Sequence, residues 1–105
     1  MNIDKLVNEM NNYEYKSNVY NIDIQTDQIN RQKEGFGKFL PFLFEKFENK
    51  EINTGKDEVI NYLNSITKTY EHIRIDKLII DIKNNTPFGR LLLFLIEKSK
   101  EGKFK

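Results

Sequence analysis

Residues 91–96 read Leu-Leu-Leu-Phe-Leu-Ile, six apolar side chains in a row. They follow Thr86-Pro87, which is typical of a helix start because threonine caps the first turn and proline is tolerated at its first position. At 100° per residue one helix face carries most of this run, while Leu93 and Phe94 fall on the opposite side. A single buried face does not shelter all six residues. We therefore expect this helix to be central to the fold or to lie in an interface.

Apolar residues at three- and four-residue steps predict further helices along the chain. Pro41 costs about 3 kcal/mol inside a helix but is tolerated in a first turn, so one helix is expected to begin near Leu40. Asn2 and Thr54 are placed to cap two others. A strand over residues 72–82 stays open as an alternative, because that stretch is rich in isoleucine. The expected helical ranges are 2–12, 26–34, 40–49, 55–72, 75–83 and 87–98.

The N-terminal region also contains an alternating pattern. Tyr13 and Tyr15 alternate with polar residues before a turn, and the alternation resumes at Tyr20. Period-two alternation around turn residues is typical of a hairpin, so we expect a short β-hairpin over residues 13–24. The predicted fold class is mainly α, a small single-domain helical bundle, with an α+β version that contains this hairpin as the alternative.

Length and composition predict one folded domain over residues 1–105. The basic tail, residues 99–105, is expected to fray into solvent. The apolar runs are far shorter than the roughly 20 residues that span a bilayer. The first ten residues do not have the basic and then apolar pattern of a signal peptide. We expect a cytoplasmic protein with no membrane partner.

The chain has no cysteine, and His72 is its single histidine. These two facts exclude disulfides, thiol nucleophiles and two-histidine metal sites. His72 has no nucleophile or carboxylate pair at a readable spacing, so we interpret it as a helix-end histidine rather than a general base. The sequence predicts no enzyme activity, no cofactor and no metal.

Two groups of residues are candidates for binding a partner. Basic side chains are the only nucleic-acid signal, and with a net charge of +1 a solvated surface is the favoured interpretation. Tyrosines and a surplus aromatic residue are typical of protein interfaces, although alternating tyrosines more often pack a sheet on a helix. The candidate partner-binding residues are Tyr13, Tyr15, Tyr20, Arg31, Lys33, Lys38, Phe94, Lys98, Lys100 and Lys103.

Residue usage indicates an origin rather than a structure. Alanine is absent, while asparagine, isoleucine and lysine make up 40 of the 105 residues. Because alanine is the best helix former, its absence is better explained by an AT-rich coding sequence. This composition favours a low-GC bacterium, or a phage or mobile element that lives in one.

Together these features predict a non-enzymatic small binding protein. We expect a phage- or mobile-element-encoded inhibitor of a host protein or ribonucleoprotein machine, in the class that includes anti-CRISPR proteins, that acts by occupying or distorting its partner. Two alternatives stay open: an RNA- or DNA-binding accessory protein, and an immunity or assembly protein that binds a toxin or structural subunit. Surplus apolar surface around residues 88–96 predicts either a partner that covers it or a homodimer.

Overall fold

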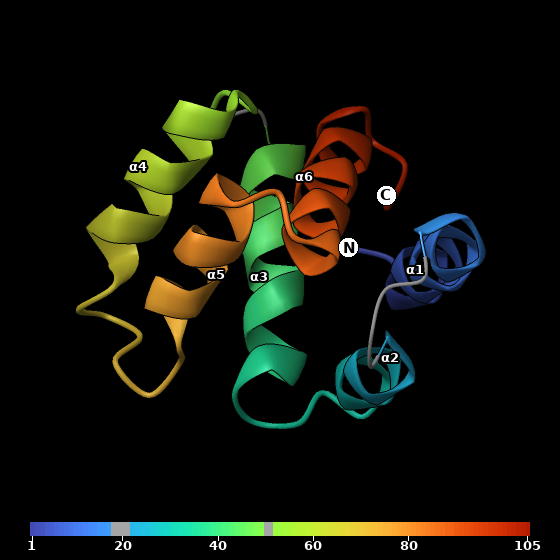
Figure 1. Cartoon of the computed structure of the whole chain (residues 1–105). Coiled ribbons are helices and arrows are strands. Elements are labelled where there is room, and N and C mark those ends of the chain that lie inside the picture. The colour runs from blue at the N-terminus through green and yellow to red at the C-terminus, as the bar shows by residue number, and fades with distance from the viewer. Residues whose placement is uncertain (18–21, 50–51) are drawn as a thin grey trace.

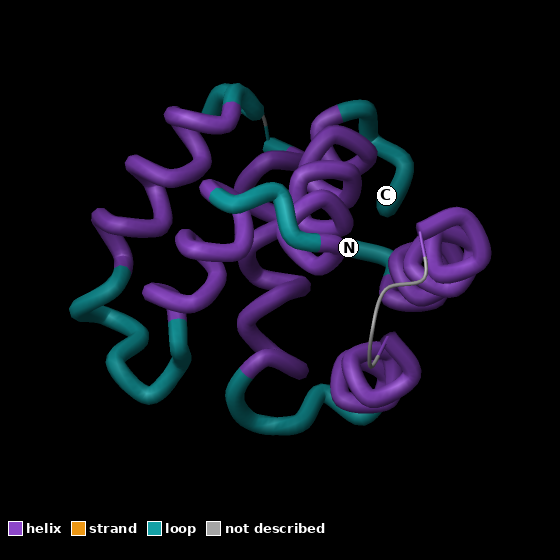
Figure 2. The backbone as a smooth tube through the Cα atoms, in the orientation of Figure 1, coloured by secondary structure: helices purple, strands orange, loops and turns teal. Residues whose placement is uncertain are grey.

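The computed structural model describes residues 1–17, 22–49 and 52–105. All regular elements within these ranges are helices (Figure 2). The prediction of a mainly α, small helical bundle is therefore confirmed. The helices are α1 (Ile3–Ser17), α2 (Ile22–Asn30), α3 (Phe36–Glu48), α4 (Lys56–Ile66), α5 (Ile75–Lys83) and α6 (Pro87–Lys100).

Helices α3 and α6 form the centre of the bundle (Figure 1). Helix α6 packs on α1, α3 and α5, and α3 packs on α2 as well as α6. Helix α4 packs mainly on α5, and its Tyr62 ring also lies 6.1 Å from the Phe47 ring of α3. The core between them is aliphatic and rich in phenylalanine. Its fully buried members include Leu6, Phe39, Phe44, Phe47, Leu63, Ile75, Leu91, Ile96 and Phe104.

Helix α6 begins as its sequence predicts. The Gly89 N–H donates a 3.1 Å hydrogen bond to the Thr86 hydroxyl, and Pro87 is the first helical residue. Leu92 and Leu95 are buried on the main apolar stripe. Leu93 and Phe94, on the other side, are half-buried and pack against the same core. The helix is central because neighbours cover it on several sides.

Helix α3 begins earlier than predicted. It starts at Phe36 instead of near Leu40, and Pro41 lies inside it. The start at Phe36 extends a continuous apolar face that includes the buried side chains of Phe39 and Leu40. Burying one such side chain stabilises the fold by about 1.5–3 kcal/mol, so this face outweighs the roughly 3 kcal/mol cost of the proline.

Gly37 explains how α2 and α3 approach each other closely. A Cβ atom at this position would overlap the backbone carbonyl oxygen of Gln28, at the end of α2. Gly35, just before α3, has a φ of 81°, a left-handed conformation that favours glycine. The two glycines therefore shape the turn into α3, and Gly37 lies within the helix.

The predicted hairpin over residues 13–24 is wrong. Tyr13 and the residues up to Ser17 belong to α1, and Ile22 begins α2; residues 18–21 lie outside the described part of the chain. In α2 the buried residues Ile22, Thr26 and Ile29 are spaced by four and three positions, which is a helical spacing. A short alternating stretch fits both periods, and packing on α3 and α1 selects the helix.

Two further boundaries differ from the prediction. Helix α4 ends at Ile66 rather than at residue 72. Its N-cap is Gly55 rather than the predicted Thr54, and the cap has no side-chain hydrogen bond. The strand alternative for residues 72–82 is wrong, because α5 begins at Ile75 and runs to Lys83.

The C-terminal tail is packed, so the predicted fraying of residues 99–105 is wrong. Phe104 is 0% exposed, and its carbonyl oxygen accepts a 2.5 Å hydrogen bond from the Asn2 N–H. The Lys5 ammonium donates to the carbonyl of Lys105 at 2.8 Å. One aromatic side chain among the tail lysines is sufficient to anchor the end of the chain on α1, because its burial removes a large apolar area from water.

Candidate functional site

A short irregular segment after α4 brings two aromatic side chains over the first turns of α3. The Thr67 hydroxyl donates to the Leu63 carbonyl at 3.0 Å as α4 ends. Backbone bonds from Tyr70 to Ile66 and from Ile73 to Tyr70 then hold successive turns. Tyr70 and His72 therefore lie in the connection between α4 and α5 and not on a helix.

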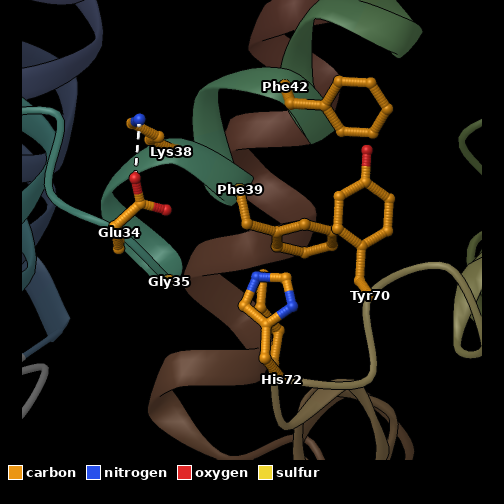
Figure 3. A pocket seen from close by; sticks show the side chains of 8 residues that line it. Glu34, Gly35, Lys38, Phe39, Phe42, Tyr70 and His72 are labelled. Carbon is orange, nitrogen blue, oxygen red and sulfur yellow. Dashed lines mark hydrogen bonds and ion pairs between the residues drawn. The ribbon is translucent and has the colours of Figure 1, made fainter.

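Four rings gather at this point (Figure 3). The Tyr70 ring lies 5.3 Å from that of Phe39 and 5.4 Å from that of Phe42, centroid to centroid. The His72 ring lies 6.4 Å from Tyr70. The Phe39–Tyr70 pair is edge to face and the other two pairs are tilted, geometries that aromatic quadrupoles favour. The rings come from α3 and from the α4–α5 connection, so the tertiary fold alone brings them together.

The four rings border a hollow of about 250 Å³. Its floor is Phe39, which is buried, while Phe42 and Tyr70 are half-buried and His72 is exposed at its edge. We call this feature the aromatic hollow. It is lined by Glu34, Gly35, Lys38, Phe39, Phe42, Tyr70, His72 and Ile73.

The charged groups at the aromatic hollow are paired with each other. The Lys38 ammonium lies 2.8 Å from the Glu34 carboxylate, one helical turn away in sequence (Figure 3). This hydrogen bond and charge lower the pKa of Glu34 below its ordinary value of 4.5, and His72 adds a smaller effect in the same direction. The Lys46 ammonium lies 5.3 Å from the centre of the Phe42 ring, a cation–π contact.

The predicted basic residues near α2 and α3 do not form a free cationic surface. Arg31 pairs with Asp27 at 2.9 Å, and Lys33 lies 3.9 Å from the same carboxylate. Lys38 pairs with Glu34 and lines the aromatic hollow. Each of the three predicted cations therefore has an acidic neighbour, and Arg31 and Lys33 share the one Asp27 carboxylate.

Three other predicted residues do come together, on the opposite side of α3. The Tyr13 ring of α1 lies 4.7 Å from the Phe94 ring of α6. The Lys98 ammonium lies 5.3 Å from the centre of the same Phe94 ring, and 4.0 Å from the Glu101 carboxylate. This α1–α6 cluster covers much of Phe94, which is half-buried rather than bare.

The remaining predicted residues are more scattered. Tyr15 lies in α1, but its side chain is not described, and Tyr20 lies outside the described residues. Lys100 is half-exposed at the end of α6, and Lys103 is exposed in the tail. Within the described chain neither of these two lysines makes an ion pair.

Sequence reasoning missed most of the aromatic hollow. The predicted helix over residues 55–72 included Tyr70 and His72, which lie in the connection after α4. A signal was present, because β-branched Thr67 and Thr69 are weak helix formers and the apolar stripe loses phase soon after them.

Neither a metal-binding cluster nor a membrane-spanning helix is found in the described part of the chain. Across residues 1–17, 22–49 and 52–105, no group of three or more His, Cys, Asp or Glu side chains is placed to hold a metal ion. In the same ranges no helix has the length and apolar character needed to cross a membrane. No family model, curated protein or solved structure matches the chain.

Proposed function

We propose that this chain is a non-enzymatic binding protein that inhibits a host macromolecular machine by docking on one of its protein components. The observation that carries the proposal is the aromatic hollow, where Phe42 and Tyr70 are half-buried around about 250 Å³ of open space. Aromatic residues are enriched at the centres of protein interfaces, and charged residues form their rims. Glu34 and Lys38 provide such a rim.

Composition supports a mobile origin for this inhibitor. The lack of alanine and the high content of asparagine, isoleucine and lysine fit a phage or mobile element of a low-GC host. Such an element gains by blocking host defence complexes, as anti-CRISPR proteins do, and the chain would meet these complexes in the cytoplasm. Inhibition by occupying or distorting a partner needs a shaped surface and no catalytic group.

His72 has a structural part in this proposal. A general base needs its target proton within about 2.6–3.2 Å, held by a positioned nucleophile or substrate. Within the described residues His72 makes a ring contact with Tyr70 and lines the aromatic hollow. We therefore assign it to the wall of a binding surface. His72→Ala should change inhibition only a few fold, whereas a loss above about a hundredfold in a folded variant would indicate catalysis.

The proposal is tested by site-specific photo-crosslinking in cells that contain candidate defence complexes. A photoreactive residue replaces Glu71, which is exposed between Tyr70 and His72, or Asn8, which is exposed on α1 as the matched control. We expect the photoreactive residue at position 71 to crosslink to a protein subunit of a complex whose activity the chain inhibits. The same residue at position 8 should not crosslink to it. Equal crosslinking at both positions, or no inhibited complex, would reject the proposal.

A second function, nucleic-acid binding, is favoured by one observation. The α1–α6 cluster places Lys98 over the Phe94 ring, which is paired with that of Tyr13, and Lys100 and Lys103 follow Lys98 in the chain. Stacking rings next to lysines are typical of single-strand binding. Its test is an RNA and DNA titration across a salt series, comparing the chain with a variant in which Lys98, Lys100 and Lys103 are alanine. Phosphate binding requires affinity to fall steeply with salt and this slope to shrink in the variant.

A further inference from the structure

We propose that the aromatic hollow is the docking site for one aromatic side chain presented by a protein partner. This inference rests on the proposed function and names the part of the surface that does the binding. Its elements are the rings of Phe39, Phe42, Tyr70 and His72 and the ion pair at their edge. Size, charge and hydrogen bonding each restrict what this hollow accepts.

The size of the hollow suits a single side chain. An apolar cavity of roughly 150 Å³ is enough to bind benzene, so about 250 Å³ holds one aromatic ring with its first methylene group. Sites for larger ligands begin at roughly 300 Å³. A ring that enters between Phe42 and Tyr70 extends a cluster whose members already meet at 5.3–5.4 Å.

The charges around the hollow favour a neutral occupant. Glu34 and Lys38 neutralise each other at 2.8 Å, so neither needs a charged ligand. A cation would meet Lys38, and it would find one Phe42 face already in contact with the Lys46 ammonium. A phosphate would meet the Glu34 carboxylate. Charge complementarity therefore selects an uncharged ring over a cationic side chain or a nucleic-acid backbone.

The Tyr70 hydroxyl supplies a polar contact at the rim. Its ring has contacts with Phe39, Phe42 and His72, while the hydroxyl has no hydrogen bond within the described residues. Figure 3 shows the hydroxyl directed toward Phe42. Tyr70 is half-buried, and its hydroxyl is suited to bond the backbone of the peptide that carries the inserted ring.

The test uses the full chain and a small probe, N-acetyl-tryptophanamide, followed by two-dimensional NMR of the backbone amides. We expect saturable shifts at Gly35, Phe39, Tyr70 and His72, and about tenfold weaker binding in Tyr70→Ala, as for a typical hot-spot residue. Tyr62→Ala is the matched control, because Tyr62 is also half-buried and ring-paired, with Phe47, but lies on α4 away from the hollow. That variant should bind the probe like the unaltered chain.

If Tyr70→Ala does not fold, Phe42→Leu replaces it, because leucine keeps apolar bulk and removes the ring. Two results would overturn the assignment: no saturable shift at these amides, or tighter binding of tetramethylammonium or inorganic phosphate than of the aromatic probe.

The same variants separate this inference from the proposed function. If Tyr70→Ala binds the probe weakly but still inhibits the crosslinked complex fully, the hollow is not the docking site and the inhibitor function stands. If the probe binds as expected but no host complex is inhibited, the proposed function fails and with it the protein partner named here. Loss of both probe binding and inhibition in Tyr70→Ala, with Tyr62→Ala unchanged, supports both.

Discussion

The Ser99 hydroxyl of α6 donates a buried hydrogen bond to the backbone carbonyl of Phe44 in α3. Ser99 is 0% exposed, and this bond joins the last turn of α6 to α3. It explains why a polar residue is found on the buried face of α6, since a buried hydroxyl is tolerated when it has a partner.

Ser99→Ala should destabilise the fold by about 1 kcal/mol, the usual net value of a buried neutral hydrogen bond. Ser65→Ala is the control, because the Ser65 hydroxyl also donates to a helix carbonyl, that of Tyr62, but at an exposed position. Urea denaturation of both variants measures the difference. Equal free energies of unfolding would mean that the contact between α3 and α6 does not depend on this bond.

The two sides of α6 should respond differently to truncation. Leu92→Ala and Leu95→Ala remove side chains that are 1% exposed, and each should cost about 2–5 kcal/mol. Leu93→Ala removes a half-buried side chain at the edge of the core and should cost less than about 1.5 kcal/mol. Thermal and chemical denaturation of the three variants checks this order. A larger loss of stability in Leu93→Ala than in the other two variants would mean that the main buried face of α6 is the one that carries Leu93.

The tail should contribute to stability through one residue. Phe104→Ala should cost about 3 kcal/mol, because it empties a fully buried aromatic site. Lys103→Ala, an exposed neighbour, should stay within about 0.5 kcal/mol of the unaltered chain. Hydrogen exchange at Lys5 and Leu6 should also accelerate in the Phe104 variant, since the tail packs on the start of α1. Unchanged stability in that variant would show a frayed tail after all.

The Glu34–Lys38 pair should be visible in a pH titration. The Lys38 hydrogen bond lowers the pKa of Glu34 in the folded chain, so its stabilising effect is present above the ordinary value of 4.5 and disappears as the pH falls through the lowered pKa. Carbon-detected NMR of the Glu34 carboxyl group measures this pKa directly. In Lys38→Ala we expect it to rise toward 4.5. A pKa that is the same in both proteins would mean that the pair does not persist in solution.

Only part of the candidate site was accessible to sequence reasoning. Phe94 and Lys98 were expected to contribute to binding, and the structure brings them together with Tyr13, although Tyr13 was expected on a hairpin. The aromatic hollow was not found, because its residues are about 30 positions apart in the chain. Their meeting depends on the path of the chain after Ile66, where α4 ends. No spacing rule within one helix predicts such a contact.

Local chemistry determined those features of this protein that depend on neighbouring residues. The start of α6 follows from the Thr86 hydroxyl and from the ring of Pro87, which both act within one helical turn. Residues 91–96 predicted that this helix is central or lies in an interface, because no single face buries six apolar side chains, and its packing on α1, α3 and α5 makes it central. Where local preferences were balanced between two conformations, the tertiary structure decided which one formed. Residues 13–17 and 22–24 are helical, although their alternation suited a strand, because α1 and α2 pack on each other and on the central pair. Pro41 is held inside α3, and Phe104 anchors the tail, because burial of apolar area around them outweighs the local cost of proline and the entropy of a chain end.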